Sequence, residues 1–360
     1  MRIESRRSVS IPPLSVCVVN FNGERYLAET LEAIRRTKAV VGEVLVVDSA
    51  STDGSEELVR GLGDVKLISL PDNRGPGRAR NIGYRAAKHD LICFVDNDVA
   101  LEPMCPICLT EELLSAGATF AMPRILYASD PDTIQYDGAA SHFMGLMSFQ
   151  NANQPVGECP TDTREIQSLI TACFLADRSR WGAEAPFDEE LFYLREDHEL
   201  GLRARIFGHR VITVPTARCL HRAGTPGLSL RLIGRYADLR VENLIRNRWA
   251  LVLKNYEARS LFLFLPVFLL FEAFQLAGVV KKGWLLRWLA AFRWLVSRLG
   301  SIGRDRREVQ RGRTTRDRDI LSGGPLPFAD RLLAGRLESS AGALLDRLTE
   351  SYWEVARRVL

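Results

Sequence analysis

The pattern of apolar and polar positions changes near Pro215. Before this residue, apolar runs of strand length alternate with stretches in which apolar side chains recur at helical spacing. Residues 91–95 are apolar throughout, which is typical of a parallel strand that is buried on both faces. Leu27, Leu31 and Ile34 fall on one face of a helix. This alternation predicts an α/β fold in which helices flank a largely parallel sheet.

Turn and cap residues separate the expected elements. The loop 73–77 combines glycine and proline, and the polar run 51–55 precedes a short helix as a cap. We expect strands at 14–19, 44–47, 65–70, 91–95 and 211–214, and helices at 26–36, 56–60 and 78–88.

Polar side chains follow three of the expected strands. Asn20, Asp48 and Asp96 each come directly after an apolar run. Ligands of open α/β sheets bind beyond the carboxyl ends of the strands, so these three side chains are expected at one edge of the sheet. Their convergence predicts a ligand site there.

Asp96 and Asp98 form an Asp-x-Asp pair at this edge. On a turn, two such carboxylates can share Mg²⁺ or Mn²⁺, which prefer carboxylate and phosphate oxygens. The cation would neutralise a diphosphate leaving group. His221 is a candidate third ligand. The alternatives are that the aspartates only cap a turn and that the histidine is structural.

Glu196 and Asp197 begin a second acidic cluster, directly before a leucine-containing helix. Acidic residues at a helix start can simply complement the helix dipole. A carboxylate placed there can also act as a general base toward an acceptor hydroxyl. Both interpretations stay open on the sequence pattern alone.

An apolar run at 261–280 is long enough to span a bilayer core. Pro266 and Glu272 interrupt it and both flanks are basic, which disfavours a single span because positive charge collects on one side. We expect a re-entrant or in-plane element, continued by a Trp- and Arg-containing helix at 284–299. A buried core helix and a true span are the alternatives. The Arg-rich stretch 304–318 suits anionic headgroups or a solvated linker.

Composition adds little to this pattern. The 360 residues suffice for one large domain with an appendage, and the net charge of +4 is mild and does not discriminate a nucleic-acid partner from others. We expect no nucleic-acid partner. Seven cysteines do not suggest a disulfide framework, and the N-terminus shows no long apolar stretch. We expect the catalytic part at the cytoplasmic face of the inner cell membrane.

Short motifs follow one another in order through the first 224 residues. They are Val-Val-Asn-Phe-Asn-Gly at 18–23, Val-Val-Asp at 46–48, Ser-Thr-Asp-Gly-Ser at 51–55, Asn-Arg-Gly at 73–75, Ala-Arg-Asn-Ile-Gly at 79–83, Asp-Asn-Asp at 96–98, Phe-Asp-Glu at 187–189, Glu-Asp at 196–197 and Gly-His-Arg at 208–210, before Pro215 and His221. In this order they resemble the inverting glycosyltransferases of family two, especially the rhamnosyltransferase-like bacterial members.

The resemblance implies a GT-A-type fold, a Rossmann-like mixed sheet flanked by helices, with a C-terminal helical, membrane-associated extension. It implies inverting transfer from a nucleotide diphosphate sugar, commonly a UDP- or dTDP-sugar, with Mn²⁺ or Mg²⁺ as cofactor. The acceptor would be a glycan hydroxyl, free or on a polyprenyl-diphosphate-linked glycan at a membrane surface, in cell-surface polysaccharide or glycolipid biosynthesis.

The resemblance also implies roles for individual residues. Asp98 would bind the metal directly, with Asp96 and His221, and Asp197 would be the base, which Glu196 positions or replaces. Nucleotide-sugar contacts are implied for Asn20, Asn22, Glu24, Asp48, Ser51, Arg80 and Asp96, with Arg80 toward the diphosphate. Thr171 and Ala172 would lie on the acceptor side, where Ala172 stands in place of a usual glycine and leaves acceptor identity open.

These predictions divide the chain into a tail at 1–13, a catalytic domain at 14–224, a basic and apolar helical membrane-associating region at 225–300, an Arg-rich linker at 301–322 and amphipathic helices at 323–360. A nucleotidyltransferase would need a glycine-rich phosphate loop directly after the first strand, and an oxidoreductase a Gly-x-Gly-x-x-Gly there, which residues 20–24 lack. A non-catalytic membrane-bound nucleotide-sugar-binding scaffold remains as an alternative, although the intact acidic residues and His221 argue against it.

Overall fold

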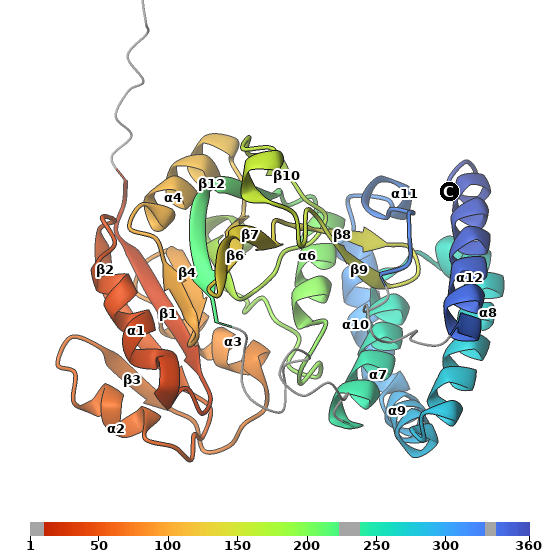
Figure 1. The fold of residues 1–360 in the computed structure, drawn as a ribbon, viewed down its shortest axis with the longest axis horizontal. Coiled ribbons are helices and arrows are strands. Elements are labelled where there is room, and N and C mark those ends of the chain that lie inside the picture. The colour runs from red at the N-terminus through yellow and green to blue at the C-terminus, as the bar shows by residue number, and fades with distance from the viewer. Residues whose placement is uncertain (1–10, 223–237, 328–335) are drawn as a thin grey trace, which may run out of the picture.

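A ten-stranded mixed sheet forms the body of the N-terminal part of the computed structural model, which describes residues 11–222, 238–327 and 336–360 (Figure 1). The strand order is β10-β12-β6-β11-β4-β1-β2-β3, with β5 paired to β12 and β7 to β6. The bounds are β1 Leu14–Asn20, β2 Val41–Asp48, β3 Lys66–Ser69, β4 Leu91–Asp96, β5 Val99–Leu101, β6 Phe120–Tyr127, β7 Asp130–Tyr136, β10 Arg164–Glu165, β11 Cys173–Asp177 and β12 Val211–His221.

The strands predicted at 14–19, 44–47, 65–70, 91–95 and 211–214 are confirmed as β1, β2, β3, β4 and β12. β1 pairs in parallel with β2 and β4, and β2 with β3, so the ends of these strands share one edge. β11 is antiparallel to β4 and β6, which makes the sheet mixed. Its apolar residues are buried like those of β4, so the hydrophobic pattern alone does not reveal its direction.

Helices cover the sheet. The three helices predicted at 26–36, 56–60 and 78–88 are confirmed with small shifts of their ends, and α3 begins at Pro76, a residue suited to a first helical turn. α3 packs on β1 and β2, and α4 packs on β6 and β12. The helices are α1 Glu24–Arg35, α2 Ser55–Arg60, α3 Pro76–Ala86, α4 Cys105–Ala116, α5 Arg178–Trp181 and α6 Glu196–Ile206, with a short 3₁₀ turn η1 at Val156–Glu158.

The C-terminal part is helical, as predicted, but its divisions differ from the expected ones. The segment expected as a linker at 301–322 contains most of α10 and all of α11, because Ile302 and Val309 bury one face of α10 while Arg304, Arg307 and Arg311 are exposed. A single long helix, α12, occupies most of 336–360. The helices are α7 Asp238–Asn255, α8 Ala258–Lys281, α9 Leu285–Ser297, α10 Leu299–Gly312, α11 Asp317–Ile320 and α12 Arg336–Ala356. The first ten residues and the start of the predicted basic helical region lie outside the described residues.

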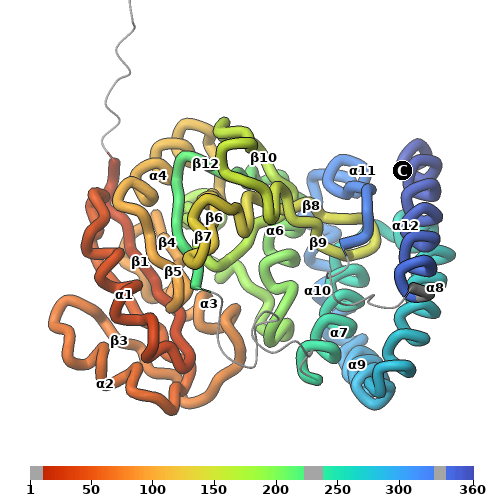
Figure 2. The backbone as a smooth tube through the Cα atoms, viewed as in Figure 1, coloured from red at the N-terminus to blue at the C-terminus, as the bar shows by residue number. Residues whose placement is uncertain are grey.

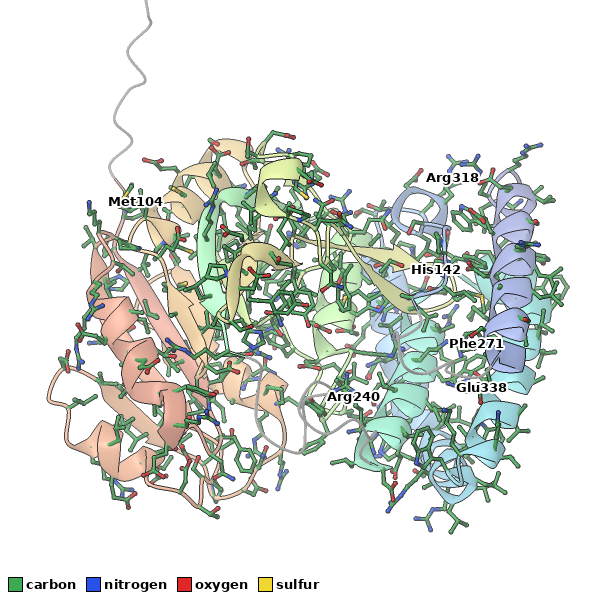
Figure 3. All side chains as sticks on the ribbon, viewed as in Figure 1. Met104, His142, Arg240, Phe271, Arg318 and Glu338 are labelled. Carbon is green, nitrogen blue, oxygen red and sulfur yellow. The ribbon has the colours of Figure 1, made fainter. Side chains whose placement is uncertain are left out.

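The helical part shares a core with the sheet part. A two-stranded hairpin, β8 Ala139–His142 and β9 Leu146–Phe149, reaches from the sheet toward α8 and α12 (Figure 2). Phe143 at its turn stacks on Trp353 with ring centroids 5.1 Å apart, and His142 Nε2 lies 3.0 Å from the Gly324 carbonyl (Figure 3). Leu202 of α6 belongs to the same apolar cluster. The C-terminal helices are therefore part of the support of α6.

α8 lies antiparallel beside α12, since Lys281 pairs with Glu338 at one end and the Tyr352 hydroxyl donates to the Leu263 carbonyl at the other. Within the described residues, α8 is the one helix long and apolar enough to cross a membrane, and 28% of its most apolar window is buried. Its Glu272 faces inward and pairs with Arg248 of α7 at 2.5 Å. α8 thus has an inner face bonded to protein and an outer face rich in apolar side chains.

Candidate active site

The carboxyl ends of β1 and β2 meet in a polar network. Asp48 is fully buried, and its carboxylate accepts hydrogen bonds from Asn20 Nδ2 (2.6 Å), Ser51 Oγ (2.7 Å) and Ser51 N (2.8 Å). Asn22, at φ 49°, donates its N–H to Ser51 Oγ and accepts from Thr52 N, both at 2.8 Å. The structure therefore brings together the predicted nucleotide-side residues of these two strands.

The loops after β1 and β2 also hold each other. Glu24 Oε2 accepts from Gly54 N at 3.1 Å, while Asp53 Oδ2 accepts from Glu24 N at 3.0 Å. Gly23 lies so close to Asn20 and Asn97 that an added Cβ would stand 2.1 Å from Asn20 Oδ1. Only a glycine fits there without displacing the amide network, so this loop has a defined shape.

Asp98 and His221 lie in contact at the next part of the edge. The antiparallel pairing of β5 with the end of β12 places His221 opposite Val99, and His221 Nε2 is 3.3 Å from Asp98 Oδ2. Gln135 Oε1 lies 2.9 Å from His221 Nδ1, so Nδ1 carries the hydrogen and Nε2 faces the carboxylate. A neutral imidazole would then point a lone pair at a carboxylate oxygen. A cation between them or a second ring proton removes this repulsion.

Asp96 stands beside this pair, and its side chain is 27% exposed. Burial and the nearby Asp98 raise its pKa, whereas Arg80 and His221 act in the opposite direction. Within the described ranges no three His, Cys, Asp or Glu side chains lie close enough to form a complete metal site. The predicted trio is therefore assembled only in part. Such an oxygen and nitrogen donor set still fits Mg²⁺ or Mn²⁺, because these cations take few protein ligands and complete their shells with phosphate and water.

Arg80 connects the strand-end carboxylates with the second acidic cluster. Its side chain is 2% exposed, and Nη2 donates to Asp96 Oδ1 at 2.7 Å and to the Thr171 carbonyl at 3.1 Å. Its Nη1 is 3.6 Å from Glu196 Oε1. The predicted orientation of Arg80 toward a diphosphate stays a prediction, and in the structure its charge serves to hold two carboxylates together.

Glu196 and Asp197 begin α6 beside Arg80. Burial, together with the neighbouring Asp197, raises the pKa of Glu196 to about 8. Burial also raises the pKa of Asp197, opposed by the His198 N–H at 2.7 Å and by the charges of Arg80 and Arg195. Two adjacent buried carboxyls share their titration, and Asp197 has the better-stabilised carboxylate. At neutral pH the pair can hold one proton on Glu196 and a basic carboxylate on Asp197.

The predicted acceptor-side residues lie at the same edge through their backbone. The Thr171 carbonyl accepts from Arg80, and the Ala172 carbonyl accepts from Asp96 N at 2.9 Å. Both residues are nearly buried. They form the wall behind Asp96 and Arg80.

Three residues of the site were missed by the sequence analysis. Asn97 Nδ2 donates to Asn20 Oδ1 at 2.7 Å, and it stands inside the Asp-x-Asp motif, which was a usable signal. Gln135 orients His221 from β7, and Asn247 of α7 donates to the Tyr193 and Leu194 carbonyls at 3.0 and 2.7 Å. No motif marks either of these last two residues, because their partners are distant in sequence.

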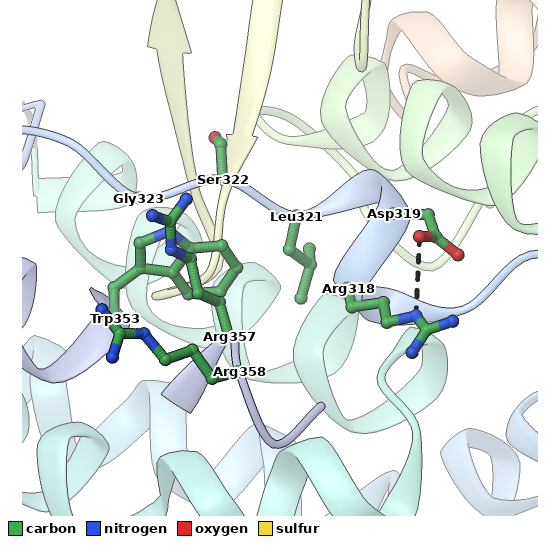
Figure 4. A pocket seen from close by; sticks show the side chains of 8 residues that line it. All are labelled: Arg318, Asp319, Leu321, Ser322, Gly323, Trp353, Arg357 and Arg358. Atoms are coloured by element: carbon green, nitrogen blue, oxygen red, sulfur yellow. Dashed lines mark ion pairs between the residues drawn. The ribbon is translucent and has the colours of Figure 1, made fainter. Parts of the chain in front are cut away.

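A cavity lies away from this cluster, between α11 and α12 (Figure 4). It measures about 620 Å³ and contains none of the predicted site residues. Two of its arginines already have carboxylate partners, Arg318 with Asp319 and Arg357 with Glu354. The chemistry predicted from the sequence therefore does not coincide with this cavity.

Comparisons with known proteins agree with the fold and the motifs. Residues 15–165 match the family model of glycosyl transferase family 2. The succinoglycan biosynthesis protein ExoO of Rhizobium meliloti (strain 1021) is 32% identical over 130 residues, which cover 36% of this chain and 36% of that protein. The matched part thus spans little more than a third of this relative.

Two solved structures resemble the chain in fold. The crystal structure of GalNAc-T7 with UDP, GalNAc and Mn²⁺ gives a TM-score of 0.54 at 17% identity, covering 69% of this chain and 49% of that one. The crystal structure of S. aureus TarS 1-349 in complex with UDP-GlcNAc gives a TM-score of 0.51 at 16% identity, covering 95% and 92%. At these identities the likeness concerns the fold, and the predicted GT-A fold is confirmed.

Proposed function

We propose that the protein is a family 2 glycosyltransferase, because residues 15–165 match that family model, and that it transfers a sugar from a nucleotide diphosphate sugar, a UDP- or dTDP-sugar, to a glycan hydroxyl. The reaction inverts the anomeric carbon and depends on a divalent cation. Similarity to a succinoglycan biosynthesis protein supports a role in polysaccharide synthesis.

The observation that carries the proposal is the position of Arg80. Its buried guanidinium contacts Asp96 at the donor edge and Glu196 at the start of α6. The two acidic motifs therefore lie on either side of one buried guanidinium. A nucleotide-binding scaffold without chemistry would have no need to bring a second carboxylate pair to this edge.

Asp197 serves as the base in this proposal. Its carboxylate takes the proton of the acceptor hydroxyl as that oxygen attacks the anomeric carbon. The bond from this carbon to the diphosphate oxygen breaks, and its electron pair leaves with the nucleoside diphosphate. A single displacement inverts the anomeric centre. Glu196, protonated beside it, keeps the two carboxyls from repelling each other.

Asp98, His221 and Asp96 would hold Mn²⁺ or Mg²⁺. The ion supplies charge neutralisation for the departing diphosphate. Gln135 contributes by keeping the hydrogen on Nδ1 of His221, which leaves Nε2 facing Asp98.

The acceptor is proposed to be lipid-linked, with the protein at the cytoplasmic face of the membrane. α8 and α9 expose large apolar side chains, among them Phe262 (82% exposed) and Leu286 (78%). Leu286 is close in sequence to the basic Lys281, Lys282 and Arg287. This combination of apolar and basic side chains is typical of helices that lie in a membrane interface. The inner face of α8 is bonded to α7, which favours the in-plane arrangement over a span.

The test of transfer uses a panel of nucleotide sugars, assayed for hydrolysis and for transfer to membrane-lipid extract with Mn²⁺, Mg²⁺ or chelator. We expect metal-dependent release of one nucleoside diphosphate, abolished in Asp98→Ala and strongly reduced in Asp197→Asn. Asp132→Asn, an exposed carboxylate at β7, is the matched control and should match the native protein. Tight nucleotide binding without turnover of any donor, even with the extract, would overturn the proposal in favour of the scaffold.

The membrane test uses substitutions, because deletion of 260–300 would also remove core residues such as Phe264 and Phe268. We expect Phe262→Ser with Leu286→Ser to reduce cosedimentation with anionic vesicles while donor hydrolysis stays unchanged. Equal vesicle binding by this double variant and the native protein would refute this membrane face.

A further inference from the structure

A second cavity, of about 350 Å³, lies where the catalytic part meets α7 and α9. The loop before α3 contributes Arg74, the loop before α6 contributes Glu190 and Phe192, and the helices contribute Arg246, Trp294 and Arg298. No role has been assigned to these side chains in the site described above. The cavity therefore needs an explanation of its own.

Three guanidinium groups line this cavity. Arg246 is the buried one, with its side chain 11% exposed, and it lies over the Trp294 ring at 4.8 Å from the centroid. Its nearest carboxylate, Glu242, is 3.7 Å away. Burial lowers the pKa of Arg246, the charge of Glu242 opposes this effect, and the charge of Arg298 adds to it. The protein thus places a desolvated cation beside another cation, an arrangement that an anion would relieve.

The carboxylates of the cavity wall already have partners. Glu190 accepts from Arg298 Nη1 at 3.0 Å and from Ser301 Oγ at 3.2 Å. Glu189 turns toward α3, where Asn81 Nδ2 donates to it at 2.9 Å. Arg74, 65% exposed, pairs with Asp72 at 2.6 Å. Arg246, whose nearest carboxylate stands beyond hydrogen-bond distance, is the guanidinium best placed to meet an anion, beside the Trp294 ring.

One of the loops that line the cavity leads to Asp197, the proposed base. Phe192 precedes Asp197 in one loop, and this loop is fixed on both sides. An added Cβ on Gly75 would stand 1.6 Å from the Phe192 carbonyl oxygen, so the loop before α3 touches it without space between. Asn247 of α7 holds the next two carbonyls. The loop segment that lines the cavity is thus held in place five residues before Asp197, the proposed base.

We propose that this cavity binds an oxyanion carried by the acceptor, a phosphate or a carboxylate, while the sugar ring next to it lies against Trp294. Guanidinium groups match the geometry of both oxyanions with paired N–H donors. The indole face accommodates the C–H face of a pyranose. The inference rests on the proposed glycosyl transfer, and it makes the acceptor an anionic glycan, whether the charge comes from a lipid diphosphate or from an acidic sugar.

The experiment titrates the full chain, saturated with UDP, with α-D-glucose 1-phosphate, D-glucuronate and methyl glucoside, followed by ligand-observed NMR. We expect the two anionic probes to bind and methyl glucoside to bind at least about tenfold more weakly. Arg74→Gln with Arg298→Gln should weaken the anionic probes about tenfold or more. Arg293→Gln, an exposed arginine of α9 that does not line the cavity, is the matched control. Tighter binding of α-D-glucose 1-phosphate than of D-glucuronate would point to a lipid diphosphate. Tighter binding of D-glucuronate would point to an acidic sugar.

Equal binding of neutral and anionic probes, or equal weakening by the control, would overturn the inference. Loss of UDP affinity in parallel with the probes would also overturn it, since the arginines would then belong to the donor site. Donor hydrolysis reports separately on the proposed transfer, because Arg74 and Arg298 lie outside the proposed catalytic groups. A protein that hydrolyses its donor but shows no anion preference refutes only the acceptor inference.

Discussion

Replacing Glu272 with glutamine tests whether α8 packs on α7 as a protein helix. Glu272 Oε1 lies 2.5 Å from Arg248 Nη1 and accepts from Trp249 Nε1 at 3.0 Å. Glutamine keeps the shape and an acceptor for the indole. It removes the negative charge that faces the Arg248 guanidinium, whose side chain is 2% exposed.

The size of the destabilisation by Glu272→Gln depends on the contacts that Arg248 keeps in the variant. Leaving one member of a buried ion pair without its partner costs about 3–5 kcal/mol. Arg248 keeps the Met144 carbonyl at 2.7 Å and the Phe271 ring at 4.5 Å, which offset part of the loss. We expect the free energy of opening α8 to fall by about 3 kcal/mol, which corresponds to roughly 150-fold faster amide hydrogen exchange in this helix.

The control is Lys281→Gln at the exposed end of the same helix. Its pair with Glu338 is largely solvated, so the loss should stay within about 1 kcal/mol, or roughly fivefold in exchange. Arg248→Met with Glu272→Leu should restore most of the protection, because an apolar pair carries no unpaired charge. Exchange in Glu272→Gln no faster than in the control would refute the reasoning and reopen a membrane-spanning α8.

Three further predictions concern the site. Gly75→Ala, at φ 92°, should lower the free energy of unfolding by about 2 kcal/mol or more, because the added Cβ meets the Phe192 carbonyl. Gly63→Ala is the control, since Gly63 lies in open space and its substitution should not have this effect. Thermal unfolding of the two variants compares them. Burial raises the pKa of Glu196 to about 8 in the folded protein, against an ordinary value of 4.5. Between these values the folded state holds a proton that the unfolded state has lost, so stability falls as pH rises. Glu196→Gln should flatten this dependence in melting curves from pH 5 to 8. Asn247→Ala removes the two hydrogen bonds that the Asn247 amide of α7 donates to the loop before α6, and it should lower kcat with little change in the donor KM. Steady-state kinetics would show this, and an unchanged kcat contradicts the positioning role.

Some parts of the fold could be predicted because they depend on residues that are neighbours along the chain. The apolar run that became β4 is recognisable from five consecutive residues, and Pro76 marks the start of α3. The helix α10 escaped prediction because its two buried residues, Ile302 and Val309, lie among many arginines. Their burial depends on the surface of α7 and α6 against which they pack, which no local pattern describes.

The donor edge of the site was also predictable. Asn20, Asp48 and Asp96 end strands that run in parallel, and parallel strands bring their carboxyl ends together whatever the exact strand order. The sequence by itself thus determined which residues meet at this edge, and their proposed chemistry follows from the residue types.

Only the tertiary structure decided how that edge is completed. Arg80 meets Glu196 because α6 packs beside the sheet, and α6 is held there by a core shared with α7 and α8. Gln135 selects the tautomer of His221 from a strand paired through β6. These contacts join segments far apart in the chain, and their formation is set by packing and strand register. Periodicity and motif spacing describe neighbours along the chain, whereas contacts of this kind depend on which surfaces bury one another.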